Sequence, residues 1–215
     1  MNLTDALLST RLLGIVRYRD DGDITGAVHA LADGGLQALE VTVDSPGAWE
    51  AIASAATLPG LVVGGGTVVT VEQVERLAGI GASFVVSPGL DVEVVQAASA
   101  LGMGTVTGIA TGTEILAARR AGVSFAKLFP AGALGTRYLR ELRGPFSQER
   151  FVATGGIELD EIGDWLNAGA HAIALGSSLA GRHAPSSPAN RDDLKKRAVR
   201  ALDLARLGTT DGANL

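Results

Sequence analysis

The chain has 215 residues, no cysteine, and 18 basic against 23 acidic side chains, which gives a net charge of −5. This size is typical of one domain with its own core, and the lack of cysteine excludes thiol nucleophiles, disulfides and cysteine-ligated metal sites. The acidic balance and an aromatic content of 4% argue against a nucleic-acid surface. Residues 1–11 carry charge, and no apolar run reaches membrane-spanning length. We therefore expect a cytoplasmic protein with neither a nucleic acid nor a membrane as partner.

Short apolar or β-branched runs recur along the chain at intervals of about 20 to 25 residues. The stretches between them space their apolar residues at helical intervals, as Val71, Val74 and Leu77 do. The eight strand-length runs are, in chain order, 12–18, 36–43, 61–66, 83–87, 103–107, 124–129, 150–154 and 171–175. Glycine, which supplies the left-handed residue that ends a helix, precedes five of them, at 33–35, 80–82, 101–102, 121–122 and 168–170.

Strands that alternate with helices through short loops must pair in parallel, and eight such units close into a (βα)8 barrel. An open doubly wound sheet is the alternative. The uniform period favours the barrel, because the glycine-rich segments do not cluster in the first unit as they do in a dinucleotide-binding sheet. The sequence predicts a single-domain TIM barrel with minimal loops over residues 1–206, followed by a polar C-terminal tail at 207–215.

In such barrels the working groups lie at the C-terminal ends of the strands. Lys127, in the sixth run, is one of three lysines and lies among apolar residues, whereas Lys195 and Lys196 belong to the polar face of the last helix. Burial of an ammonium lowers the pKa of a lysine, and a neutral amine can attack a ketone to form a Schiff base. A buried ion pair, or a side chain that extends its amine to the rim, is the structural alternative.

Two further charged residues are candidates for the same cavity. Glu40 is a lone charge in the second run and suits a general base, although it could equally form a salt bridge to Lys127 or Arg17 without a role in turnover. Arg17 lies near the end of the first run, and its guanidinium can bind the carboxylate of a substrate through two hydrogen bonds. The alternative for Arg17 is an ordinary surface position.

Glycines next to hydroxyl residues end the last two runs, as Thr154-Gly155-Gly156 and Gly176-Ser177-Ser178. The loops after strands seven and eight are where these barrels commonly bind phosphate through backbone N–H groups. A third glycine-rich turn, Gly64-Gly65-Gly66, is expected after the third strand, with Thr67 as a donor. The sequence therefore predicts an anion site at the same end of the barrel.

Metal chemistry is not expected. His29 belongs to a helix, His171 to the entrance of the eighth strand, and His183 to the loop before the last helix, so the three do not form a ligand set. We predict neither a metal nor an organic cofactor.

The sequence resembles the class I aldolases for 2-keto-3-deoxy-6-phosphogluconate (KDPG) and 4-hydroxy-2-oxoglutarate (KHG). The resemblance covers about residues 12–180 and runs in order through several motifs. They are Leu39-Glu40-Val41-Thr42, Gly64-Gly65-Gly66-Thr67-Val68, Ser87-Pro88-Gly89, Phe125-Ala126-Lys127-Leu128-Phe129-Pro130-Ala131, Gly144-Pro145-Phe146 and Thr154-Gly155-Gly156-Ile157.

The resemblance implies a Schiff-base lysine at Lys127, a general acid/base at Glu40 and a homotrimer. It also implies substrate binding by the remaining candidates, with the carboxylate held by Arg17 and Thr67 and the phosphate by Gly155, Gly156, Gly176 and Ser177. Thr154 resembles the threonine of gluconate-type enzymes, whereas Asp44-Ser45-Pro46 resembles the galactonate-type sequence. Both epimers of the substrate therefore remain open.

The resulting hypothesis is an aldolase that cleaves KDPG to pyruvate and glyceraldehyde 3-phosphate. Aldolases for the galactonate epimer or for KHG are the nearest alternatives. Two further alternatives are an isomerase or epimerase that enolises a phosphosugar without a covalent intermediate, and a barrel that binds a phosphometabolite without turnover.

Overall fold

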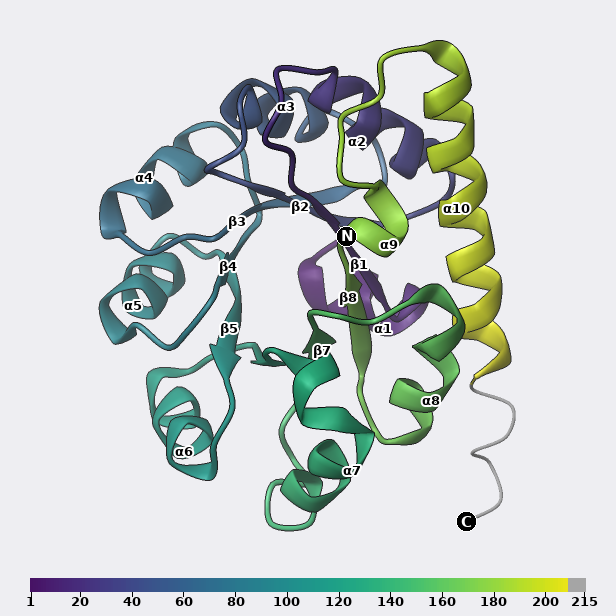
Figure 1. Cartoon of the computed structure of the whole chain (residues 1–215). Helices are drawn as coiled ribbons and strands as arrows, with labels where there is room; N and C mark the ends of the chain where they lie inside the picture. Colours follow the sequence, from purple (N-terminus) through teal and green to yellow (C-terminus); the bar gives the residue numbers. More distant parts are fainter. Residues whose placement is uncertain (209–215) are drawn as a thin grey trace.

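The computed structural model describes residues 1–208, which form a closed barrel of parallel strands in the order β1 to β8 (Figure 1). The predicted barrel is confirmed, and the open sheet is wrong. Each strand pairs with its neighbours in sequence, and β8 closes on β1 through Leu12–Ile173. The strands are β1 Leu12–Val16, β2 Ala38–Thr42, β3 Val62–Gly66, β4 Phe84–Ser87, β5 Gly104–Ile109, β6 Phe125–Leu128, β7 Phe151–Thr154 and β8 Ala172–Leu175.

Helices surround the strands on the outside (Figure 1). The predicted glycine stops are confirmed, because Gly35, Gly81, Gly102, Gly122 and Gly169 all have positive φ. The backbone of α7 is interrupted at Gly135, and a short 3-10 helix, Leu159–Glu161, precedes α8. The helices that follow β1 to β7 are α2 Ile24–Asp33, α3 Ala48–Ala55, α4 Val71–Gly79, α5 Val92–Ala100, α6 Gly112–Ala121, α7 Ala131–Arg143 and α8 Ile162–Asn167.

A helix that the sequence pattern does not predict, α1 (Leu3–Thr10), precedes the first strand. Asn2 caps its start, and Arg11 ends it with a left-handed backbone rather than the expected glycine. Leu3 and Leu7 pack with Phe84 and other residues inside the barrel, at the N-terminal ends of the strands. In Figure 1, α1 lies behind the strands across the barrel axis. This helix closes the floor of the barrel.

The chain after β8 departs from the simple repeat. A short helix, α9 (Ser177–Ala180), is followed by an irregular loop and by α10 (Pro188–Leu207), which packs against α2 and α8. Helix α10 extends one residue beyond the predicted domain end, and residues 209–215 of the predicted tail lie outside the described part of the chain. Within residues 1–208, no helix is both long and apolar enough to cross a membrane.

The packing of α1 into the floor of the barrel gives a first prediction. Leu7 is fully buried, whereas the neighbouring Leu8 is 46% exposed. We expect Leu7→Ala to lower the free energy of unfolding by about 2–5 kcal/mol, as large-to-small changes in cores do, and Leu8→Ala to change it by less than about 0.5 kcal/mol. Urea unfolding followed by circular dichroism measures both. Equal effects of the two variants would contradict the role of α1 as a packed floor.

Candidate active site

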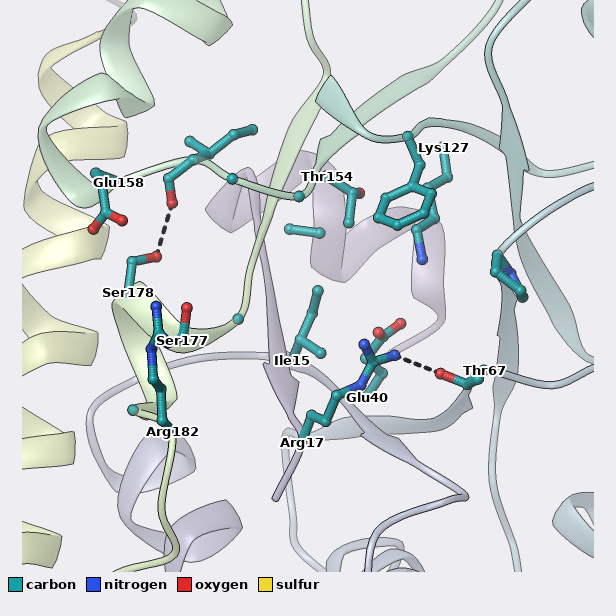
Figure 2. Close-up of a pocket in the computed structure, with 18 of the residues that line it drawn as sticks. Ile15, Arg17, Glu40, Thr67, Lys127, Thr154, Glu158, Ser177, Ser178 and Arg182 are labelled. Atoms are coloured by element: carbon teal, nitrogen blue, oxygen red, sulfur yellow. Dashed lines mark hydrogen bonds between the residues drawn. The ribbon is translucent and has the colours of Figure 1, made fainter. Parts of the chain in front are cut away.

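A cavity of about 380 Å³ opens at the C-terminal ends of the strands. Figure 2 shows two groups of side chains around it, with Lys127 and Glu40 in one group and Ser177 and Arg182 in the other. The structure brings every residue of the predicted site to this cavity. They are Arg17, Glu40, Thr67, Lys127, Thr154, Gly155, Gly156, Gly176 and Ser177.

Lys127 projects into the cavity from β6, and its residue is only 7% exposed. Phe125 lies below it in the barrel interior, and the ring centroid of Phe129 is 5.1 Å from its Nζ. Burial lowers the pKa of the Lys127 amine, the charge of Arg17 lowers it further, and the charge of Glu40 opposes both. The amine forms no hydrogen bond or ion pair within residues 1–208, so the structural ion pair considered for it is not observed.

Glu40 stands on β2 and is 2% exposed. Its Oε2 is buried without a hydrogen-bond partner, and it forms no ion pair with Lys127 or Arg17 among the described residues. Burial raises the pKa of this carboxyl group, and the nearby charges of Lys127 and Arg17 oppose the rise. An orphaned carboxyl oxygen with a raised pKa is suited to exchange a proton with a bound molecule.

The predicted run 61–66 is confirmed as β3, so the second expectation, that Gly64, Gly65 and Gly66 form a turn after this strand, is wrong. The neighbouring strands explain why glycine is needed there. A Cβ on Gly66 would lie 3.0 Å from Oε1 of Glu40, and a Cβ on Gly64 would lie 2.5 Å from the carbonyl oxygen of Phe84. The strand therefore leaves room for the carboxyl group of Glu40.

Thr67 begins the loop after this strand with a φ of 60°, an uncommon conformation for a β-branched residue. Its Oγ1 accepts a hydrogen bond of 2.6 Å from Nη2 of Arg17. Arg17 is exposed but lines the cavity beside Glu40, so it is not an ordinary surface arginine (Figure 2). This strained residue fixes the position of a guanidinium group that faces the cavity.

The other group of cavity residues comes from the loops after β7 and β8. Gly155 and Gly156 have φ of 94° and 69°, and their N–H groups donate no hydrogen bond within residues 1–208. Ser178 donates from Oγ to the carbonyl oxygen of Ile157 at 2.9 Å, which joins the two loops. The free N–H groups and the hydroxyl of Ser177 give this end of the cavity the character of an anion site.

Three charged residues of the cavity were not predicted from the sequence. Arg19 lines it but forms an ion pair with Asp44 at 3.3 Å. Glu158 and Arg182 line its anion end. Glu158 and Arg182 come after β7 and β8 in the chain, and this position could have predicted them, because the loops after the strands meet at the C-terminal face of the barrel.

The histidines do not join the site. His29 is 3.2 Å from the hydroxyl of Ser54 through its Nε2, and His171 accepts from the N–H of Phe151 at the opposite end of the barrel. His183 lies in the loop before α10. Among residues 1–208, no group of three or more potential ligand residues could hold a metal ion.

A desolvated lysine near a carboxyl group at the mouth of a (βα)8 barrel is the arrangement of an enzyme that works through a Schiff base. Comparison with known proteins agrees. The family model "KDPG and KHG aldolase" matches residues 3–195. The chain therefore belongs to the family of KDPG and KHG aldolases, which are carbon–carbon lyases.

The individual relatives are named after two different substrates, the galactonate epimer and the gluconate epimer. A probable 2-dehydro-3-deoxy-6-phosphogalactonate aldolase of Rhizobium meliloti is 35% identical over 89% of this chain and 89% of its own length. A 2-dehydro-3-deoxy-phosphogluconate aldolase of Treponema pallidum is 37% identical over 83% of this chain and 85% of its own. The solved KDPG aldolase of Legionella pneumophila, with pyruvate captured as a covalent carbinolamine, is 25% identical, with a TM-score of 0.75 over 94% of this chain and 95% of its own.

The electrostatics of the site give a second prediction, which concerns the pKa of Lys127. Because the chain has three lysines, ¹³C-labelled lysine can be followed by NMR, and Lys127→Met assigns the signal. We expect Lys127 to titrate below the usual 10.5. Glu40→Gln should lower its pKa further, because the carboxylate favours the ammonium form, whereas Arg17→Gln should raise it, because a repelling charge is lost. Shifts of the opposite sign would contradict this description of the site.

Proposed function

We propose that the chain catalyses the reversible aldol cleavage of KDPG to pyruvate and glyceraldehyde 3-phosphate through a Schiff base on Lys127. The observation that carries the proposal is the buried amine of Lys127, which faces the cavity with a lowered pKa and no partner within residues 1–208. The covalent carbinolamine of the Legionella relative supports the same chemistry.

The first step uses the neutral amine. The Nζ lone pair of Lys127 attacks the C2 carbonyl carbon of the substrate, and the carbonyl oxygen takes up a proton to give a carbinolamine. Loss of the hydroxyl group as water then leaves an iminium ion. A lowered pKa increases the share of Lys127 that is in the amine form, which the attack requires.

Glu40 supplies the proton transfers. Its carboxylate removes the proton of the C4 hydroxyl group, the C3–C4 bond breaks, and the electron pair of that bond flows into the iminium to form an enamine. The aldehyde leaves, C3 of the enamine takes up a proton, and water hydrolyses the new iminium to pyruvate and the free amine. Its buried, unpartnered Oε2 and raised pKa suit this exchange, which typically contributes about 10²- to 10⁴-fold in rate.

The remaining candidates hold the two anionic ends of the substrate. Arg17 and Thr67, which are hydrogen-bonded to each other, bind the carboxylate beside Glu40. The loops at Gly155, Gly156, Gly176 and Ser177 bind the phosphate.

Thr154 lies between the two ends of the cavity and is 2% exposed (Figure 2). Its hydroxyl group supports the gluconate epimer, as in the gluconate-type enzymes that it resembles. The galactonate epimer and KHG stay as alternatives, since relatives of both phosphorylated types match this chain. Family membership favours all three over a non-covalent isomerase or epimerase and over a binding protein without turnover.

We also infer a homotrimer in the cytoplasm. The resemblance to trimeric aldolases supports the oligomer. Val69 and Val92 are 51% and 43% exposed beside the starts of the adjacent helices α4 and α5, where another subunit could cover them. A phosphorylated substrate and the lack of cysteine support the location.

Reductive trapping tests the covalent step. With pyruvate and borohydride, we expect one adduct per chain, on Lys127, and no adduct in Lys127→Met. Glu40→Gln should still form the adduct, because the amine is intact, but should lose at least about 100-fold in turnover, the contribution of one general acid/base. Intact-protein mass spectrometry and a coupled pyruvate assay measure the two effects. An adduct that survives Lys127→Met would refute the role of this residue.

The choice of epimer is tested by pyruvate release from the gluconate-type and galactonate-type acids in parallel. We expect the gluconate-type acid to be preferred. Thr154→Val should reduce this preference about 10-fold or more, because a buried hydroxyl contact to substrate is lost without a change of shape. A parent enzyme that prefers the galactonate-type acid would move the assignment to that alternative.

A further inference from the structure

We propose that Arg182 binds the terminal phosphate directly and thereby selects phosphorylated substrates, and that Asp20 is a positioning residue for the loop that carries it. This inference rests on the proposed function and adds a charge and a support to its phosphate end.

The guanidinium groups of the cavity differ in their partners. Arg17 is hydrogen-bonded to Thr67, and Arg19 is paired with Asp44. Arg182 forms neither a hydrogen bond nor an ion pair within residues 1–208, although it lines the same cavity. Of these three groups, that of Arg182 is the one without a polar partner among the described residues, so all of its donors can turn to a ligand.

The position of Arg182 fits a phosphate rather than the reacting carbons. In Figure 2 it stands beside Ser177 and Ser178, at the end of the cavity opposite Lys127. The free N–H groups of Gly155 and Gly156 belong to the same end. Backbone and hydroxyl donors orient an anion, and a guanidinium adds a positive charge and paired hydrogen bonds to the same phosphate.

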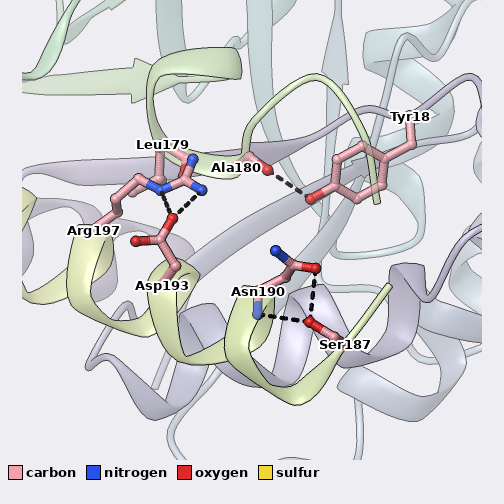
Figure 3. Close-up of polar contacts among 7 residues, drawn as sticks. All are labelled: Tyr18, Leu179, Ala180, Ser187, Asn190, Asp193 and Arg197. Atoms are coloured by element: carbon pink, nitrogen blue, oxygen red, sulfur yellow. Dashed lines mark hydrogen bonds and ion pairs between the residues drawn. The ribbon is translucent and has the colours of Figure 1, made fainter. Parts of the chain in front are cut away.

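Backbone contacts hold the loop before Arg182. The hydroxyl group of Tyr18 donates to the carbonyl oxygen of Ala180 at 2.8 Å, and Arg197 donates from Nη1 to the carbonyl oxygen of Leu179 at 3.1 Å (Figure 3). Gly181 then turns the chain with a φ of 79°. The segment that leads into Arg182 is thus tied to the loop after β1 and to α10.

Asp20 holds the loop on the other side of Arg182. Its Oδ1 accepts from the N–H of Ala184 at 3.2 Å, and its Oδ2 lies 3.2 Å from Nδ1 of His183. The N–H of Ala184 is also the main reason that the pKa of Asp20 is lowered. Because Asp20 follows Arg17 and β1 in the chain, this contact joins the loop of the carboxylate end to the loop of the phosphate end.

Glu158 sets the electrostatic balance at this end. It lines the cavity near Arg182 without an ion pair to it, so its carboxylate repels a phosphate unless Arg182 offsets the repulsion. Loss of Arg182 should therefore be partly compensated by Glu158→Gln in the same chain.

The test compares Arg182→Gln with the parent on two substrates. KDPG carries a phosphate, and KHG does not. We expect kcat/KM for KDPG to fall roughly 10- to 100-fold, which corresponds to one charge-assisted hydrogen-bonded pair. The loss should fall on KM, with kcat and the kinetics of KHG changed less than about twofold, because the interaction binds ground state and transition state alike. Inorganic phosphate should inhibit the variant more weakly, and Glu158→Gln should restore part of the lost affinity.

Arg200→Gln is the matched control, because Arg200 is an exposed arginine of α10 away from the cavity. Equal KM values for KDPG in Arg182→Gln, Arg200→Gln and the parent would overturn the proposal. So would an equal loss on KDPG and KHG. Pyruvate trapping on Lys127 separates this failure from failure of the proposed function, since the adduct needs no phosphate.

Asp20→Asn tests the positioning role, with Asp21→Asn as its control, because Asp21 is exposed and has no polar partner within residues 1–208. We expect Asp20→Asn to raise KM for KDPG about 3- to 10-fold with kcat unchanged, since the charge-assisted contacts that hold the loop are weakened. The effect should disappear when Arg182→Gln is already present. A KM equal to that of Asp21→Asn, or an effect that persists without Arg182, would overturn the role of Asp20.

Discussion

The burial of Lys127 and Glu40 in one cavity, away from water, is the constraint on which the site depends. Two opposite charges in solvent would leave each group near its usual pKa, but burial moves the pKa of Lys127 down and that of Glu40 up. The two pKa values thereby move toward each other, which favours proton exchange at both groups. Uncompensated burial is costly, so the surrounding barrel must hold both groups in place.

The barrel holds Lys127 and Glu40 in place with glycines on the neighbouring strands and with tightly packed apolar side chains below them. In the sheet, Lys127 is paired with Gly108 and Glu40 with Gly64, so that each long side chain has a strand neighbour without a side chain. Phe125 fills the interior below Lys127, and the leucines of α1 fill the floor. The rest of the cavity is made by loops, and these can carry substrate contacts while the strands fix the reacting groups.

The repeating pattern predicted the fold because the strands are buried on both faces and read as short apolar runs, whereas each helix buries one face and spaces its apolar residues at helical intervals. Lys127 and Glu40 could be found for a related reason, since a lone charge in an apolar strand is conspicuous. Helix α1 was missed because Arg11, not glycine, ends it. The glycines of β3 were misplaced because the need for them comes from Glu40 and Phe84 on the neighbouring strands, which sequence spacing does not reveal.

The closed floor also has a kinetic consequence. Leu3 and Leu7 fill the N-terminal end of the barrel, so molecules enter and leave the cavity at the C-terminal mouth. In the proposed mechanism, the three-carbon fragment stays bonded to Lys127 while the aldehyde departs through this single opening. That mechanism requires ordered release, with the aldehyde first and pyruvate second, and in the synthetic direction it requires pyruvate to bind before its partner.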